Sequence, residues 1–126
     1  MTIIKCLSEL IEEELSDSDR YIDLAMKWRK EEPDTADLFY ELSTEEMGHS
    51  EKLHEEVTEL IEEYRKEHGE PPKDMMVLWD YLHEKHVATA TRIRIKQGMY
   101  KVWQLETLRN RGVFFTIAIS DMFDIL

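Results

Sequence analysis

The chain has 126 residues and a formal net charge of −12, from 16 basic and 28 acidic side chains. This acidity argues against general nucleic-acid binding, because phosphate contacts need clustered lysine and arginine, whereas it is compatible with attracting cations. The single cysteine, Cys6, excludes a disulfide within the chain, and no apolar run reaches the roughly 20 residues that span a bilayer. We therefore expect a one-domain cytoplasmic protein with no nucleic-acid and no membrane partner.

Three long helices are predicted, over residues 3–29, 34–68 and 73–111. Pro33 disfavours helix at the residue before it and so separates the first two. Gly69 suits the backbone conformation that ends the second helix. Because the connections are short, we expect consecutive helices to pack as antiparallel neighbours. The predicted fold class is all-α, a long antiparallel helical hairpin plus a third helix.

Further local signals refine these helices and set the domain limits. Asp34 can cap the second helix, the two prolines before residue 73 can open the third, and Gly98 is a possible weak point in it. We assign residues 1–112 to the helical domain. Residues 113–126 form an apolar, β-branched tail that suits a strand, a short docking helix or an interaction segment. We expect this tail to pack on its own bundle or on a neighbour.

On the first helix, Glu14 shares a face with apolar residues. At about 100° per residue it lies near the centre of an apolar stripe, unlike its acidic neighbours, and Tyr21 follows two turns later on the same face. The stripe consists of Leu7, Leu10, Tyr21, Leu24, Ala25 and Trp28. Desolvating an unpaired carboxylate costs several kcal/mol, and a bound cation can offset this cost. Glu14 is therefore a candidate metal ligand.

On the second helix, the sequence Glu46-Met-Gly-His49 places a carboxylate and an imidazole side by side on one face. By helical phase Glu46 lies near the centre of an apolar stripe, and His49 lies roughly 50° from the centre, still on the apolar face. That stripe consists of Phe39, Leu42, Leu53, Val57, Leu60 and Tyr64. A second pair with the same spacing, Glu51 and His54, is predicted to point to solvent. The alternative to a metal site is a buried Glu–His hydrogen-bonded pair or a partly hydrated acid.

Two histidines accompany the apolar stripe of the third helix. His86 lies near the centre of the stripe marked by Met75, Trp79, Leu82, Ala90 and Ile93, and His83 lies on its flank. Counting from the Gly69 turn puts His86 about 10 Å along the bundle from Glu46 and His49, too far for a shared site. We interpret both as core or interface histidines. The alternative is a zinc or second metal site that they form with His54.

Glu14 with Tyr21, followed by Glu46-x-x-His49, resembles the first half of a ferritin or rubrerythrin di-iron bundle. The resemblance covers roughly residues 3–68 and implies that Glu14, Glu46 and His49 bind iron, with Tyr21 near the site. A second Glu-x-x-His on a fourth helix is missing, so the chain is similar to half-bundle members such as encapsulated ferritins. In those, two chains complete one site. No clear encapsulin-targeting peptide and no rubredoxin-type cysteine pairs are found.

These inferences predict a homodimer or higher homo-oligomer that binds two iron ions per shared site, with manganese or zinc as possible replacements. The expected activity is oxidation of Fe(II), as in a ferroxidase, or reduction of peroxide. One alternative is a non-enzymatic protein in which the metal only staples the dimer. Another is a partner-binding module whose interface includes the apolar tail, Trp79 and Trp103.

Overall fold

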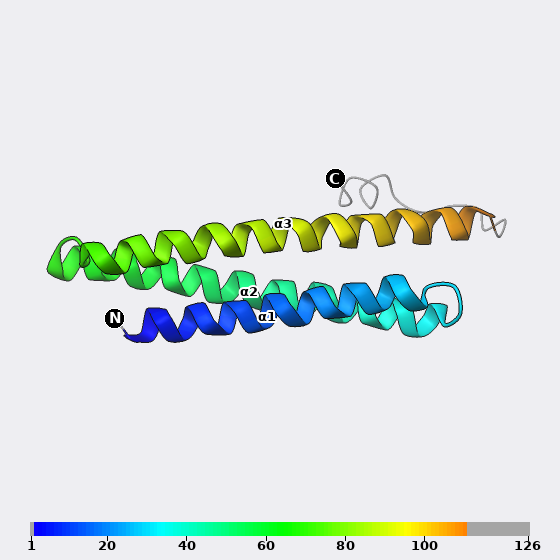
Figure 1. Cartoon of the computed structure of the whole chain (residues 1–126), viewed down its shortest axis with the longest axis horizontal. Helices are drawn as coiled ribbons and strands as arrows, with labels where there is room; N and C mark the ends of the chain where they lie inside the picture. Colours follow the sequence, from blue (N-terminus) through cyan, green and yellow to red (C-terminus); the bar gives the residue numbers. More distant parts are fainter. Residues whose placement is uncertain (1, 111–126) are drawn as a thin grey trace.

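In the computed structural model, which describes residues 2–110, these residues form three long helices (Figure 1). Helix α1 spans Thr2–Trp28, α2 spans Pro33–His68 and α3 spans Lys73–Asn110. The all-α prediction is confirmed, and each helix ends within a residue or so of its predicted limit. The apolar tail at 113–126 and the domain limit at residue 112 lie outside the described residues.

The ends of α2 show which local signals fix a helix. Pro33 occupies the first turn and Glu32 the N-cap position, with no hydrogen bond from its side chain, so the prediction that Asp34 caps α2 is wrong. Because proline has a fixed φ and no N–H, it starts the helix itself and moves Asp34 into the first turn. Gly69 ends α2 with φ 79°, and its N–H donates to the Arg65 carbonyl at 3.0 Å. Helix α3 continues through Gly98 without a break.

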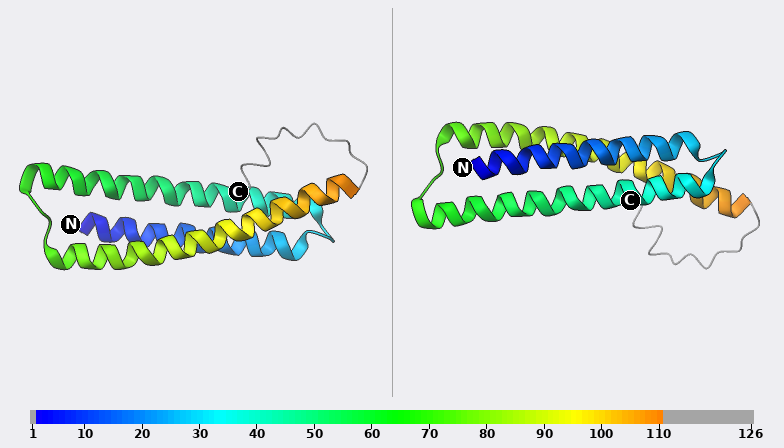
Figure 2. Two further views of the ribbon diagram at one scale, coloured as in Figure 1. Left: turned by 90° about the horizontal axis from the view of Figure 1, so that it is seen from above. Right: turned by 90° about the horizontal axis from the view of Figure 1, so that it is seen from below.

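The helices α1 and α2 form an antiparallel hairpin, and α3 runs along one side of it (Figures 1 and 2). In Figure 2, α1 lies between α2 and α3 near the α2–α3 turn, and α3 then crosses the hairpin obliquely. Helix α3 consequently packs on α1 more extensively than on α2. The expectation that consecutive helices pack as antiparallel neighbours is confirmed for α1 with α2, and α2 and α3 are also antiparallel but contact each other only sparsely.

Buried residues recur at seven-residue intervals on all three helices. Such a repeat keeps one seam of each helix facing its neighbours, as in coiled-coil packing. The residues of these seams are Ile4, Ile11, Ser18 and Ala25 on α1, Ala36, Ser43, Ser50 and Val57 on α2, and Trp79, His86, Ile93 and Tyr100 on α3. We call the side of the hairpin that α3 covers the closed face.

The apolar stripes around Glu14 and Glu46 coincide with this core only in part: Leu7, Ala25 and Val57 are buried, but other members lie on a second side of the hairpin. Leu10 is 38% exposed, and the other members on the same side are half-buried. We call this second surface the open face, formed by Leu10, Glu14, Tyr21 and Leu24 of α1 and by Phe39, Leu42, Glu46, His49, Leu53 and Leu60 of α2. Each apolar stripe identified in the sequence therefore includes residues of both the closed and the open face. This happens because each helix of the hairpin is apolar over an arc wide enough for two faces.

Polar contacts hold α3 on the closed face. Lys96 donates to Asp19 at 2.9 Å and to Asp23 at 2.8 Å, and Arg92 donates to Asp19 at 3.0 Å. Nearer the end of α3, the Tyr100 hydroxyl donates to Asp37. None of the helices in the described part of the chain is both long and apolar enough to cross a membrane.

Candidate metal centre

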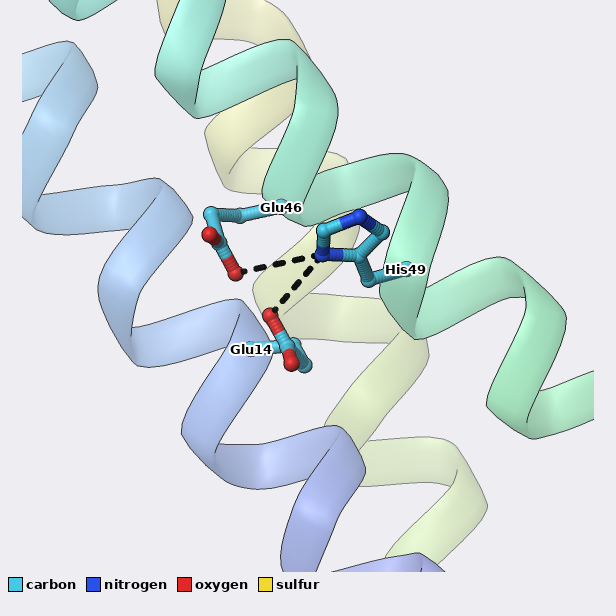
Figure 3. A group of neighbouring side chains, drawn as sticks. All are labelled: Glu14, Glu46 and His49. Carbon is cyan, nitrogen blue, oxygen red and sulfur yellow. Dashed lines mark ion pairs between the residues drawn. The ribbon is translucent and has the colours of Figure 1, made fainter.

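The antiparallel hairpin brings Glu14 from the middle of α1 next to Glu46 and His49 from the middle of α2 (Figure 3). His49 Nδ1 lies 3.5 Å from Glu14 Oε2 and 3.6 Å from Glu46 Oε2. One donor atom from each residue lies within 4.8 Å of the other two. Within residues 2–110, no other group of three acids, histidines or cysteines meets this condition.

Glu14 has a polar atom that the protein leaves unsatisfied. Its Oε2 is buried and has no hydrogen-bond partner among the described residues. A buried acceptor without a partner costs about 1–3 kcal/mol, and more when it is charged. Native proteins rarely leave such an atom without an explanation, and an ion is one of the usual ones. The atom points into the cluster, toward His49 (Figure 3).

The three side chains fit a transition-metal ion. Bonds from such an ion to carboxylate oxygen or imidazole nitrogen are about 2.0–2.2 Å, so neighbouring donor atoms lie about 3–3.5 Å apart. The separations of 3.5 and 3.6 Å exceed that range only slightly. Two carboxylates and one imidazole suit iron, manganese or zinc. Three donors also leave coordination positions free for further ligands.

The cluster lies on the open face rather than in the core. The side chain of His49 is 54% exposed, that of Glu14 27% and that of Glu46 22%. In Figure 3, α3 passes behind the hairpin on the far side from the three residues. The inward direction predicted for Glu14 and Glu46 is therefore only partly realised, because α3 covers the neighbouring stripe.

Tyr21 lies outside the cluster. It is half-buried on the open face and stacks on Phe39, with ring centroids 6.4 Å apart. Seven helical residues separate it from Glu14, which is about 10 Å along the axis. Its contact with Phe39 across the hairpin gives it a packing role next to the site.

The second Glu-x-x-His pair, Glu51 and His54, is only partly exposed to solvent as predicted. Glu51 is exposed and pairs with Arg94, as expected for a solvent-facing acid. His54, however, is half-buried, and its Nε2 lies 3.0 Å from His83 Nδ1. The prediction that His54 points to solvent is wrong, because the phase count on α2 did not include the flank that α3 reaches.

His86 is buried, which confirms its interpretation as a core residue. Its Nε2 lies 3.5 Å from Glu12 Oε1, a contact that the sequence reasoning missed. Burial lowers the pKa of His86, although the nearby Glu12 opposes the shift. Burial and the neighbouring histidines also lower the pKa of His54. Both imidazoles are therefore mainly neutral near pH 7.

The model of the rubrerythrin family matches residues 5–110. This span includes all three helices almost completely, together with Glu14, Glu46 and His49. No curated protein and no solved structure shows significant similarity to the chain.

Proposed function

The chain belongs to the rubrerythrin family, a ferritin-like group, and we propose that it is a di-iron oxidoreductase whose site is shared between two copies. Each copy would contribute Glu14, Glu46 and His49. The activity would be oxidation of Fe(II) by oxygen or reduction of peroxide. The observation that carries the proposal is the unsatisfied Glu14 Oε2 beside a second carboxylate and an imidazole.

Sharing between two copies follows from the number of ligands. Two-metal sites in helix bundles use four carboxylates and two histidines, about twice what the hairpin offers. Helix α3 lies on the other side of the hairpin and brings no acid to this cluster (Figure 3). A two-fold axis through the open face would bring the same three residues from a second copy.

The apolar surroundings support the same arrangement. Glu46 sits in a seven-residue series with Phe39, Leu53 and Leu60, all only half-buried in the single chain. A second hairpin packed on this series would form a four-helix bundle and remove its apolar side chains from water, at about 25 cal/mol per Å². The metal cluster would then lie at the centre of a bundle core.

The residues of the chain have distinct parts in the proposed chemistry. Bound ferrous ions would supply electrons to oxygen or peroxide. Glu14 and Glu46 would hold the ions and neutralise their positive charge, and His49 would bind through one ring nitrogen. The apolar residues around them would exclude bulk water once the second copy covers the site. Tyr21, two turns away along α1, is too far for a hydrogen bond to the site, and its part would be to supply an electron.

The test compares iron binding and oxygen uptake in matched variants. Anaerobic protein given two Fe(II) per dimer should consume oxygen faster than buffer does. Glu46→Ala and His49→Ala should lose bound iron and this uptake, whereas Glu45→Ala and His68→Ala, which alter exposed residues of the same helix, should retain both. Equal iron content and uptake in all four variants would contradict the site.

A structural metal is the second candidate, since the same donors accept zinc and the half-exposed apolar series needs a partner in either case. In that case the protein would bind iron at Glu46 and His49 with oxygen uptake no faster than buffer, and zinc would promote self-association equally well. Faster uptake that depends on His49 would exclude it.

A further inference from the structure

We propose that His54, His83 and His86 form a second metal site, for one divalent cation of the zinc class, between α2 and α3. The three imidazoles line one pocket of about 320 Å³, together with Ser50, Glu55 and other residues of α2 and α3. None of them belongs to the Glu14–Glu46–His49 cluster. The proposed site is therefore additional to the one on the open face.

The first two donors already face each other. His54 Nε2 and His83 Nδ1 lie 3.0 Å apart, and their rings stack with centroids 4.6 Å apart. Two imidazole nitrogens that bind one zinc ion at about 2.0–2.1 Å, with tetrahedral angles, lie about 3.3–3.4 Å apart. If His54 Nε2 and His83 Nδ1 moved apart by a few tenths of an ångström, both could therefore bind one zinc ion in place of their hydrogen bond.

His86 supplies the third donor. It follows His83 by three residues, so both rings project from the same side of α3. The side chain of His86 is only 7% exposed, and neither of its ring nitrogens has a hydrogen-bond partner among the described residues. A buried imidazole nitrogen without a hydrogen bond is costly, and a cation at Nδ1 would satisfy it. The three donor atoms do not yet converge, so His86 must turn its ring toward the pair.

Glu12 fits the role of the partner that orients a metal-binding histidine. Its Oε1 lies 3.5 Å from His86 Nε2, the nitrogen that remains free when Nδ1 binds the cation. Metal-binding histidines usually donate their other N–H to a carboxylate or carbonyl. A small closing movement of the exposed Glu12 side chain would make this hydrogen bond.

The donor sets should separate the two sites chemically. Three imidazoles favour zinc, nickel or copper, whereas two carboxylates with one imidazole also accept iron and manganese. The cation would join α2 to α3, which otherwise pack together sparsely.

Trp79 provides a reporter for the test. Its ring centroid lies 5.9 Å from that of His54, 5.7 Å from that of His83 and 6.5 Å from that of His86. Zinc added to metal-free protein should change the tryptophan fluorescence until the site is saturated. Trp79→Phe should remove that change. His83→Ala should weaken this zinc binding at least tenfold, whereas His68→Ala and His49→Ala should leave it unchanged.

The Glu12 variant tests the orienting role. Loss of such a carboxylate typically weakens metal binding 10–100-fold, and Glu12→Ala should do so by about that factor while Glu13→Ala, its exposed neighbour, should not. Equal zinc affinity in wild type, His83→Ala and Glu12→Ala would overturn the proposal.

X-ray absorption on zinc gives a readout that does not depend on altering the proposed ligands. His49→Ala protein loaded with one zinc ion per chain should show three imidazole ligands. Zinc bound with one imidazole or none would overturn the proposal. This result is independent of the proposed iron chemistry, which is measured by oxygen uptake at His49 and Glu46.

Discussion

The two apolar faces of the α1–α2 hairpin differ in what covers them. The closed face packs under α3, and two of its buried serines bond to each other across the hairpin: Ser18 Oγ donates to the Ser43 carbonyl at 2.7 Å, and Ser43 Oγ donates to the Ser18 carbonyl at 2.7 Å. The open face has comparable apolar residues, yet the buried Glu14 Oε2 accepts no hydrogen bond there from the described residues. The closed face is therefore covered within one chain, whereas no helix among the described residues covers the open face, which is what the proposed shared site requires.

The largest contrast should be seen in core truncations. Ile11 is buried in the α1 seam on the closed face, so Ile11→Ala should lower the free energy of unfolding by about 2–5 kcal/mol. Leu53→Ala on the open face should cost below about 1 kcal/mol in dilute, metal-free protein, because Leu53 is already half-exposed. Chemical denaturation followed by circular dichroism measures both. Equal losses of unfolding free energy in the two variants would mean that the two faces are equally buried.

For self-association, we expect a substitution on the open face to have a large effect, although its effect on the stability of the monomer is small. Leu53→Lys puts a charge into the proposed interface between copies and should weaken dimerisation by about 2 kcal/mol or more, roughly thirtyfold. Its helicity as a monomer should equal that of the wild type. Lys52→Ala, beside it and exposed, is the matched control. Dimerisation unaffected by Leu53→Lys would place the interface elsewhere.

A substitution of Tyr100 tests how strongly its contacts hold α3 on the closed face. Burial and the adjacent Asp37 raise the pKa of Tyr100, whose ring also stacks on Tyr40 with centroids 5.0 Å apart. Tyr100→Phe keeps the ring and removes the hydrogen bond to Asp37, so we expect a loss of about 1–2 kcal/mol in unfolding free energy. Thr107→Val, which removes a local helix bond, should cost less. A loss below that of Thr107→Val would show that the Tyr100–Asp37 contact does not hold α3.

The smallest effect should come from Asp19. Burial alone would raise its pKa, but hydrogen bonds and charge attraction from Lys96 and Arg92 outweigh burial and lower it below 3.8. A lowered folded-state pKa adds stability that is present above the unfolded value and is lost as the pH falls through the folded one. We expect Asp19→Asn to cost about 1 kcal/mol at neutral pH and to flatten the decline in stability below pH 4. An unchanged acid profile would contradict the Lys96–Asp19 contact.

The sequence predicted the helices well because proline, glycine and apolar periodicity act locally. Pro33 begins α2 through its fixed φ, and Gly69 ends it because glycine adopts a positive φ without strain. It also predicted that Glu14 and Glu46-x-x-His49 come together, since an antiparallel hairpin with a short turn fixes which residues lie at the same height. The family match supports the fold that these signals indicate.

The burial of the candidate site was not predictable from α1 and α2 alone. Periodicity identifies an apolar stripe but not which helix covers it, and both hairpin helices carry stripes broad enough for two neighbours. Helix α3 covers the seam that contains Ile11, whereas Leu10 on the neighbouring stripe is left 38% exposed. The same helix brings His83 to His54, a contact between residues distant in sequence that no phase count on one helix reveals.

Sedimentation of the wild type with and without Fe(II), under anaerobic conditions, tests most directly whether the open face holds a shared site. We expect iron to shift the protein from monomer toward dimer with about two ions per dimer, because an ion that binds only the dimer stabilises it by mass action. Glu46→Ala should abolish the shift, and Glu45→Ala should preserve it. A monomer that retains two iron ions per chain, with Glu46 required for both, would contradict the shared site.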